Sequence, residues 1–326
     1  MQHRLNRRRF MAALAAGTAA LAQPALAQTY PSKVVTLLVP FPPGSATDSV
    51  ARKLAEGLRA AFGQPFIIEN KPGGDGILAA RMAARAEPDG LTIFVTTNTT
   101  HSANVNIYTS LPYDPQRDFL PVGGIMKIPM VLAVRADSPA TDVASFIKLA
   151  KSKPMTFGSG NTSSRGATEM FKARAGLDML HVPYRGTPQA VTDLLSGSID
   201  VLFPDPSSAL GPIEGGQLKI LGVASTTRLN KFPNVPTIAE SGFPGFEMVA
   251  WVGAFVPSKT PADIVTRLNE ELNKILAQKD LLTYFDTVGA QAYPTTPDGL
   301  RAYVDEDIRR WAEIVEIGKI EKKANQ

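Results

Sequence analysis

The sequence predicts a two-lobed α/β protein, in which each lobe is a mostly parallel sheet flanked by helices. Short apolar runs alternate with amphipathic stretches along most of the chain, which is the pattern of strand–helix–strand units. The chain has 326 residues, more than one hydrophobic core usually organises, so two lobes are expected. The first 27 residues differ from the rest and have the composition of a leader.

Residues 1–27 predict a signal peptide. Arg4 and the run 7–9 form a basic head, and an uncharged stretch rich in alanine and leucine follows. Residues 25–27 place small side chains where a signal peptidase cuts. We therefore expect cleavage after Ala27 and a periplasmic mature protein. The arginine run partly fits a twin-arginine signal, so both this route and the general secretory route stay open.

The charge of the chain comes from this leader. The whole sequence has 34 lysines and arginines against 30 acidic residues, and the leader holds four arginines and no acid, which leaves 34 − 4 = 30 against 30. A balanced mature chain gives no reason to expect binding to nucleic acid or to anionic membranes. The absence of cysteine means that no disulfide stabilises the fold.

The first part of the mature chain predicts strands that lead into helices. A β-branched run at 34–39 fits a strand buried on both faces, and a turn at 40–44 follows it. Apolar residues at every fourth position from Val50 to Phe62 then predict a helix that Gly63 ends. The next expected elements are a strand at 66–69, a loop at 70–76, a helix at 77–85 and a strand at 91–95.

The second part repeats this alternation and ends in helices. The expected strands are 131–134, 156–157, 180–182, 201–203 and 220–223, and the expected helices are 142–151, 167–175 and 189–195. Residues 158–166 are expected to be a polar loop, 225–246 a surface excursion and 246–256 extended. Two helices should close the chain, one capped by Thr260 with buried Ile264, Leu268, Leu272 and Ile275, the other capped by Thr296 with buried Leu300, Val304, Ile308, Trp311 and Val315. The acidic run 305–307 is expected on a solvated face.

Two crossings between lobes are expected near 125–129 and 248–253. Lobe one would then hold 28–127 and 250–326, and lobe two 128–249. In open α/β sheets a ligand binds beyond the carboxyl ends of the strands, so the site is expected between the lobes.

The loop 40–48 is the first candidate for ligand binding. Gly44 lets backbone approach a ligand closely, and the start of the following helix offers free N–H groups to an anion. Asp48 is expected to cap or orient the turn. A plain strand–helix turn remains the alternative. We place Phe41, Pro43, Gly44 and Ser45 at the site, with Thr97 and Asn98 from a neighbouring strand end.

The stretch 158–166 is the second candidate. Its hydroxyls and small residues lead into a helix start, which suits a carboxylate, and we place Ser159, Asn161, Ser163 and Ser164 at the site. The stretch half-matches a dinucleotide fingerprint, but the acidic ribose partner is missing, which argues against a cytoplasmic dinucleotide enzyme. Tyr184 and Arg185 would meet the far end of the ligand, with an ordinary surface arginine as the alternative, and Asp205 lies at a further strand end. Trp251 is expected to pack the hinge.

Catalytic patterns are scarce. After removal of the leader only His101 and His181 remain, and His181 lies in an apolar run that fits a structural histidine. The sequence shows no cysteine nucleophile, no histidine pair spaced for a metal and no nucleophile elbow. We therefore expect neither catalysis, nor a metal, nor a cofactor. An exported hydrolase acting on a small carboxylate ester or amide stays as the rival hypothesis.

Several motifs together resemble the receptors of tripartite tricarboxylate transporters, also called Bug solute-binding proteins. They are 40–48 (PFPPGSATD), 69–74 (ENKPGG), 182–186 (VPYRG), 193–197 (DLLSG) and 234–242 (NVPTIAESG). Ser45 stands where the family usually has a second glycine. The resemblance implies a periplasmic clamshell that holds a carboxylate through backbone N–H groups, hydroxyls and water. It also implies membrane transporter subunits as partners, or a sensing role. We expect a monomer; the identity of the carboxylate stays open.

Overall fold

The computed structural model describes residues 30–324, and the predicted leader and its cleavage site lie outside these residues. From Lys33 onward the chain forms one unit that contains two separate sheets, in orders β11-β4-β10-β3-β1-β2 and β7-β6-β8-β5-β9. The described part of the chain has no helix long and apolar enough to cross a membrane.

The six-stranded sheet draws its strands from two distant parts of the sequence. They are β1 (Val35–Val39), β2 (Phe66–Asn70), β3 (Thr92–Thr97), β4 (Phe119–Pro129), β10 (Val249–Pro257) and β11 (Gln291–Ala292). The five-stranded sheet comes from the sequence between them, with β5 (Val131–Arg135), β6 (Met155–Ser159), β7 (Met179–Pro183), β8 (Val201–Leu202) and β9 (Leu218–Val223). This confirms the two-lobed α/β fold; the exact lobe limits stay a prediction.

The expectation of mostly parallel sheets needs a correction, because both sheets are mixed. Parallel pairing joins β1 to β2 and β3, and β6 to β7 and β8. The pairs of β10 with β3 and β4, of β11 with β4, and of β5 with β8 and β9 are antiparallel. Parallel neighbours need a crossover connection, usually a helix, whereas β4 leads out to β5 of the other sheet and β10 returns after β9 of that sheet.

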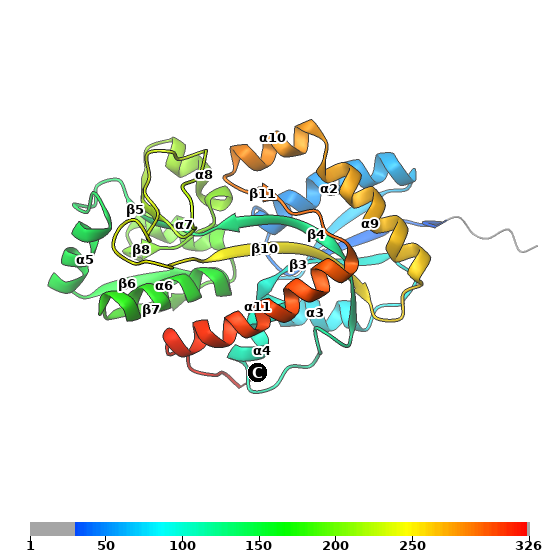
Figure 1. Ribbon diagram of the computed structural model, residues 1–326, viewed down its shortest axis with the longest axis horizontal. Helices are drawn as coiled ribbons and strands as arrows, with labels where there is room; N and C mark the ends of the chain where they lie inside the picture. Colours follow the sequence, from blue (N-terminus) through cyan, green and yellow to red (C-terminus); the bar gives the residue numbers. More distant parts are fainter. Residues whose placement is uncertain (1–29, 325–326) are drawn as a thin grey trace, which may run out of the picture. The chain divides into compact units, whose positions relative to one another are not determined.

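The two long strands β4 and β10 form the crossing between the sheets. They pair antiparallel from Val249–Pro129 to Pro257–Phe119, and Figure 1 shows them lying side by side. The sequence placed the crossings at 125–129 and 248–253 and predicted 246–256 as extended, which covers nearly all of β10 but only the last part of β4. The first half of β4 was missed because its two glycines, Gly123 and Gly124, lower its strand propensity. Gly124 is required by the packing, because a Cβ there would collide with the carbonyl oxygen of Tyr293.

Helices cover both sheets. The helices of eight residues or more are α2 (Ala46–Phe62), α3 (Ile77–Ala84), α5 (Val143–Ser152), α6 (Thr162–Ala175), α7 (Thr187–Ser196), α8 (Pro206–Glu214), α9 (Ala262–Leu276), α10 (Lys279–Thr287) and α11 (Pro297–Ile317); shorter ones are η1 (Gly74–Gly76), α4 (Asn104–Ile107) and the π-helix η2 (Thr99–Ala103). The sequence reading missed α8 and α10. It also started α6 five residues late, because Asn161 caps this helix within the predicted loop. Thr260 does not cap α9: the N-cap is Pro261, and the Thr260 hydroxyl donates to the Pro257 carbonyl at 2.8 Å.

The last helix, α11, corrects one more expectation. Asp307 was placed on a solvated face, yet only 5% of it is exposed, and its Oδ2 accepts a 2.7 Å hydrogen bond from Trp251 Nε1. Burial raises the pKa of this carboxyl, although the hydrogen bond from Trp251 and the charges of Arg310 and Lys127 act in the opposite direction. Trp251 is fully buried on the crossing strand β10. The bond therefore fixes α11 to the crossing, and it agrees with a packing role for Trp251.

Candidate functional site

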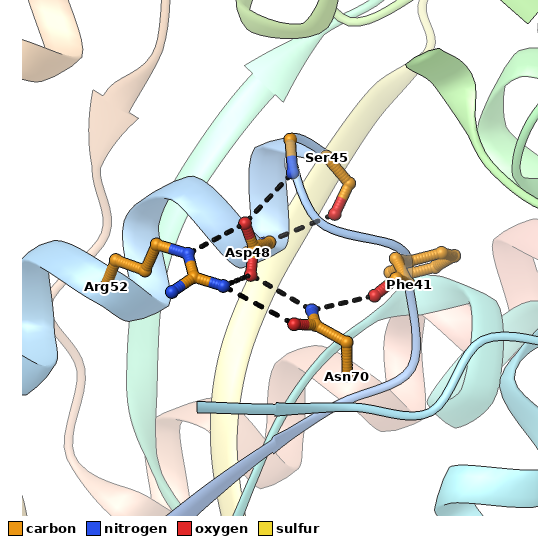
Figure 2. A network of polar contacts seen from close by, with 6 residues as sticks. Phe41, Ser45, Asp48, Arg52 and Asn70 are labelled. Atoms are coloured by element: carbon orange, nitrogen blue, oxygen red, sulfur yellow. Dashed lines mark hydrogen bonds and ion pairs between the residues drawn. The ribbon is translucent and has the colours of Figure 1, made fainter. Parts of the chain in front are cut away.

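The turn between β1 and α2 is organised by Asp48. Its carboxylate accepts hydrogen bonds from the Gly44 backbone N–H at 3.0 Å, from Asn70 Nδ2 at 3.0 Å and from Arg52 Nε and Nη2 at 3.1 and 2.9 Å. Asn70 Nδ2 also donates to the Phe41 carbonyl at 2.9 Å, and Figure 2 shows this network joining the loop to β2. Burial by itself raises the pKa of Asp48, but the bonds from Arg52, Gly44 and Asn70 outweigh it and hold the pKa below its usual value. The prediction that Asp48 orients this turn is confirmed.

Ser45 begins α2 and Gly44 shapes the approach to it. Ser45 is the N-cap, and its hydroxyl accepts the Asp48 backbone N–H at 3.3 Å. Gly44 has a φ of +81°, a left-handed conformation that residues with a Cβ adopt only with strain. The turn can therefore present the free N–H groups of α2 to its surroundings.

The end of β3 meets the start of α6 from the other sheet. Asn98 Nδ2 donates to Ser163 Oγ at 2.8 Å, and the Ser163 hydroxyl lies 3.2 Å from Asn98 Oδ1. One residue further, the hydroxyls of Thr99 and Thr162 lie 2.9 Å apart. All four residues are buried. Sequence positions some 60 residues apart, which were expected on opposite lobes, are thus in direct contact.

The start of α6 is tied in turn to α7. Asn161 caps α6 by accepting the Ser164 backbone N–H at 2.8 Å, and its Nδ2 donates to Thr187 Oγ1 at 3.2 Å. Thr187 is the first residue of α7. Gly160 makes this approach possible, because a Cβ there would lie 2.2 Å from the Thr187 nitrogen.

One cavity collects the starts of four helices. Its lining includes the start of α2, the cap of α6, the first residue of α7 and Asp205, which is the N-cap of α8. The full lining is Phe41, Ser45, Ala46, Thr47, Thr97, Asn98, Thr99, Ile128, Met130, Asn161, Ser163, Thr187, Asp205, Ala250 and Val252. Helix N-termini carry partial positive charge and unpaired N–H groups, so their convergence favours an anion. No lysine, arginine or histidine is in this lining.

The enclosed volume of this cavity is about 30 Å³. A cavity of ~10–15 Å³ suffices for one water, so this space holds little more than water. An organic acid of several carbons therefore fits only if the walls move apart.

Seven of the predicted site residues line this cavity: Phe41, Ser45, Thr97, Asn98, Asn161, Ser163 and Asp205. Four others lie close in sequence but do not line it: Pro43, Gly44, Ser159 and Ser164. The Ser164 hydroxyl is enclosed without a hydrogen-bond partner. Tyr184 and Arg185 line a second cavity of about 280 Å³, together with Asp75, Tyr108 and Lys323; Phe41 lines both.

Four of the eight lining residues that the sequence analysis missed come from the crossing segments; the others are Ala46, Thr47, Thr99 and Thr187. Ile128 and Met130 lie two positions apart, as do Ala250 and Val252, and all four line the cavity. Side chains two positions apart in a strand share one face. This alternation was visible in the sequence. With both crossings predicted as strands, it would have identified the apolar side chains of the cavity wall.

Neither histidine lines the cavity. His101 is fully buried against Phe255, with ring centroids 3.9 Å apart, and burial lowers its pKa to about 3. His181 Nε2 lies 2.7 Å from Ser159 Oγ, a serine–histidine contact that the sequence did not reveal. No carboxylate among the described residues bonds the other ring nitrogen of His181. Burial, followed by the charges of Arg165, Lys323 and Lys172, lowers the pKa of His181 to about 4, which makes it a weak base at neutral pH. Within residues 30–324 no group of side chains is arranged to hold a metal ion.

The family model described as "Tripartite tricarboxylate transporter family receptor" matches residues 50–320. The chain belongs to this family. Two curated proteins similar to the receptor are a UPF0065 protein from the tcbD-tcbE intergenic region of Pseudomonas sp. strain P51, 35% identical over 95% of this chain and 94% of its own length, and BugT of Bordetella pertussis, 32% identical over 91% and 93%.

Three solved structures share the fold of the receptor. R. palustris Rpa4515, solved with adipate, is 32% identical over 90% of this chain and all of its own, with a TM-score of 0.88. MatC of Rhodopseudomonas palustris, solved with malate, is 33% identical over 88% of this chain and all of its own, with a TM-score of 0.82. Periplasmic binding protein BugD gives a TM-score of 0.86 at 30% identity.

Proposed function

We propose that this receptor captures a small organic carboxylate outside the cytoplasmic membrane, in the cavity between β3 and the starts of α2, α6, α7 and α8, and catalyses no reaction. The observation that carries the proposal is the convergence of four helix N-termini on one cavity whose lining has no cationic side chain. Partial charges and neutral donors hold an anion in such a site. Because two relatives were solved with adipate and malate, aliphatic carboxylates are among the ligands that we propose for this receptor.

The proposal also covers the location of the receptor and its partners. Membership of the receptor family supports delivery of the ligand to the membrane subunits of a tripartite transporter, although a sensing role is compatible with the same site. We also propose that the receptor acts as a monomer. Export with cleavage after Ala27 would place the mature chain in the periplasm. The N-terminal sequence of the protein recovered from a periplasmic extract tests this step, with Gln28 as the expected first residue.

The direct test is a screen of carboxylates against the mature chain by thermal shift and calorimetry. A ligand at 100 times its Kd stabilises the folded state by about 2.7 kcal/mol, so a true ligand raises the melting temperature measurably. The same preparation is incubated with small esters and amides of the acids that bind. No turnover is expected, because the Ser159–His181 contact has no orienting carboxylate and a histidine of low pKa.

A pair of adjacent substitutions tests the position of the site. Ser163→Ala removes a hydroxyl that lines the cavity, and loss of one hydrogen bond to a charged ligand weakens binding by roughly 10- to 100-fold. Ser164→Ala is the matched control, because its hydroxyl is enclosed, has no partner and does not line the cavity. Equal affinities of the two variants would contradict the proposed site, and failure of every carboxylate to bind would contradict the function.

A further inference from the structure

Asp205 is the only ionisable residue in the cavity lining, and its charge is negative. Only 3% of it is exposed. A carboxylate in the wall of an anion site opposes the partial positive charge of the four helix starts. The position of Asp205 should therefore influence which carboxylates bind in the cavity.

One oxygen of the Asp205 carboxylate already accepts hydrogen bonds from the start of its own helix, α8. Oδ1 accepts the Ser207 hydroxyl at 2.7 Å and the Ser208 backbone N–H at 2.9 Å, which caps α8. The other oxygen, Oδ2, accepts no hydrogen bond, and Asp205 forms no ion pair with any described residue. Oδ2 is not fully enclosed by protein, and Asp205 lines the cavity, so a ligand there can reach this carboxylate.

No protein group donates to Oδ2, so a ligand that presents an N–H or O–H group to it gains a charge-assisted hydrogen bond. A second ionised carboxylate at the same place would meet a like charge instead. We propose that Asp205 selects carboxylates whose second polar group is a hydrogen-bond donor, an ammonium or a hydroxyl, over fully ionised dicarboxylates of the same length. This inference rests on the proposed function, because it assumes that the first carboxylate of the ligand binds at the helix starts.

The test compares ligands that differ only in the second group. 6-Aminohexanoate and 6-hydroxyhexanoate are measured against adipate, and 4-aminobutyrate and 4-hydroxybutyrate against succinate, all by calorimetry on the mature chain. For pairs in which either member binds, we expect the donor-bearing acid to bind at least ~10-fold more tightly, the scale on which a site built for a hydrogen bond rejects an analogue without it.

The substitution Asp205→Asn replaces a hydrogen-bond acceptor in the cavity wall with a donor. Asparagine caps a helix as well as aspartate, so its carbonyl can keep the bonds to Ser207 and Ser208 while its NH₂ group faces the cavity. The wall then offers a donor in place of an acceptor. We expect the preference for amino and hydroxy acids to fall at least ~10-fold and the affinity for the dicarboxylates to rise.

Asp142→Asn is the matched control. Asp142 caps α5 by accepting the Ser145 N–H at 2.7 Å, is exposed and lies outside the cavity lining, so its variant should keep the wild-type ranking. Circular dichroism of both variants checks that the fold is kept. If no carboxylate binds the wild-type chain, the proposed function itself fails. If carboxylates bind but Asp205→Asn leaves their ranking unchanged, or the wild type prefers the dicarboxylates, only the role of Asp205 is overturned.

Discussion

Replacing Asp48 with alanine tests how the loop that leads into α2 is held. The substitution removes the acceptor for the Gly44 N–H, the Asn70 amide and both Arg52 nitrogens. The Asp48 side chain is 4% exposed, whereas that of Arg52 is 52% exposed. The loss therefore falls mainly on Gly44 and Asn70, whose polar groups are partly buried and are left without their partner.

The size of the effect follows from these exposures. An exposed ion pair contributes about 0–1 kcal/mol, so Arg52 adds little. Each hydrogen bond to a charged acceptor contributes roughly 1.5–3 kcal/mol and such bonds are not additive, so we expect Asp48→Ala to lower the free energy of unfolding by about 3 kcal/mol. At about 2 °C for each kcal/mol in a chain of this size, the melting temperature falls by about 6 °C.

Urea unfolding at neutral pH measures this loss, and a pH series gives an independent check. Since the pKa of Asp48 is lowered in the folded state, its stabilisation is complete above the usual aspartate value of 3.8 and is lost as the pH falls through the lower folded value. The difference between wild type and variant should thus be constant from pH 7 to pH 5 and shrink only below about pH 4.

Asp142→Ala and Arg52→Ala are the comparisons. The first removes an exposed helix cap and should cost about 1 kcal/mol, and the second should cost about 0–1 kcal/mol. If Asp48→Ala destabilises the protein no more than Asp142→Ala does, the network in Figure 2 does not hold the loop and the reasoning is wrong.

Two further predictions concern pH and backbone packing. His101 is fully buried and its pKa is lowered from 6.5 to about 3, so the unfolded state takes up a proton at a higher pH than the folded state does. The free energy of unfolding should therefore fall by about 1.4 kcal/mol for each pH unit between those two values. His101→Phe should reduce this slope in urea unfolding from pH 7 to pH 5, and an unchanged slope would refute the prediction. Gly160→Ala places a Cβ 2.2 Å from the Thr187 nitrogen and 2.3 Å from the Gly186 carbonyl carbon, so it should displace the start of α7 and abolish carboxylate binding in calorimetry, whereas Gly63→Ala, with no atom within 4 Å, should keep full affinity.

The sequence predicted the strand–helix alternation well because its signals are local. The stripe of Val50, Leu54 and Leu58 on α2 is buried, and Gly63 ends that helix in a left-handed conformation. The two sheets also come from the parts of the chain that the two predicted series cover. Seven of the thirteen predicted site residues line the cavity, and all but Phe41 are polar residues at or just after strand ends.

The failures arose where a regular four-residue spacing was extended too far. A helix turns once in 3.6 residues, so a stripe spaced by four drifts around the surface. In α11 the buried positions are 300, 304, 307, 311 and 314, and this alternation of four and three puts Asp307 in the core and Ile314 in place of Val315. In α9 the buried position is Val265, not Ile264, for the same reason. No local rule places a carboxylate in the core; its partner, Trp251, is 56 residues away.

Two long-range contacts were beyond the sequence for a different reason. The pairing of Asn98 with Ser163 and the contact of Ser159 with His181 depend on how separate elements pack. From the sequence, each of these residues could be recognised only as a separate polar residue near the end of a helix or strand. Only the three-dimensional arrangement shows that Ser163 lies in the cavity wall and that Ser164, with the same side chain one residue later, does not.

The contacts across the cavity explain why such a site can be selective without a fixed cation. Asn98 and Ser163 already satisfy each other, as do Thr99 and Thr162. A molecule that enters between them must replace those bonds, and an apolar molecule cannot, so it would leave four buried polar groups unpaired. A carboxylate has two oxygens that can accept from the Asn98 amide and the Ser163 hydroxyl together. Affinity then depends on an exchange of hydrogen bonds, which admits anions and keeps their binding reversible.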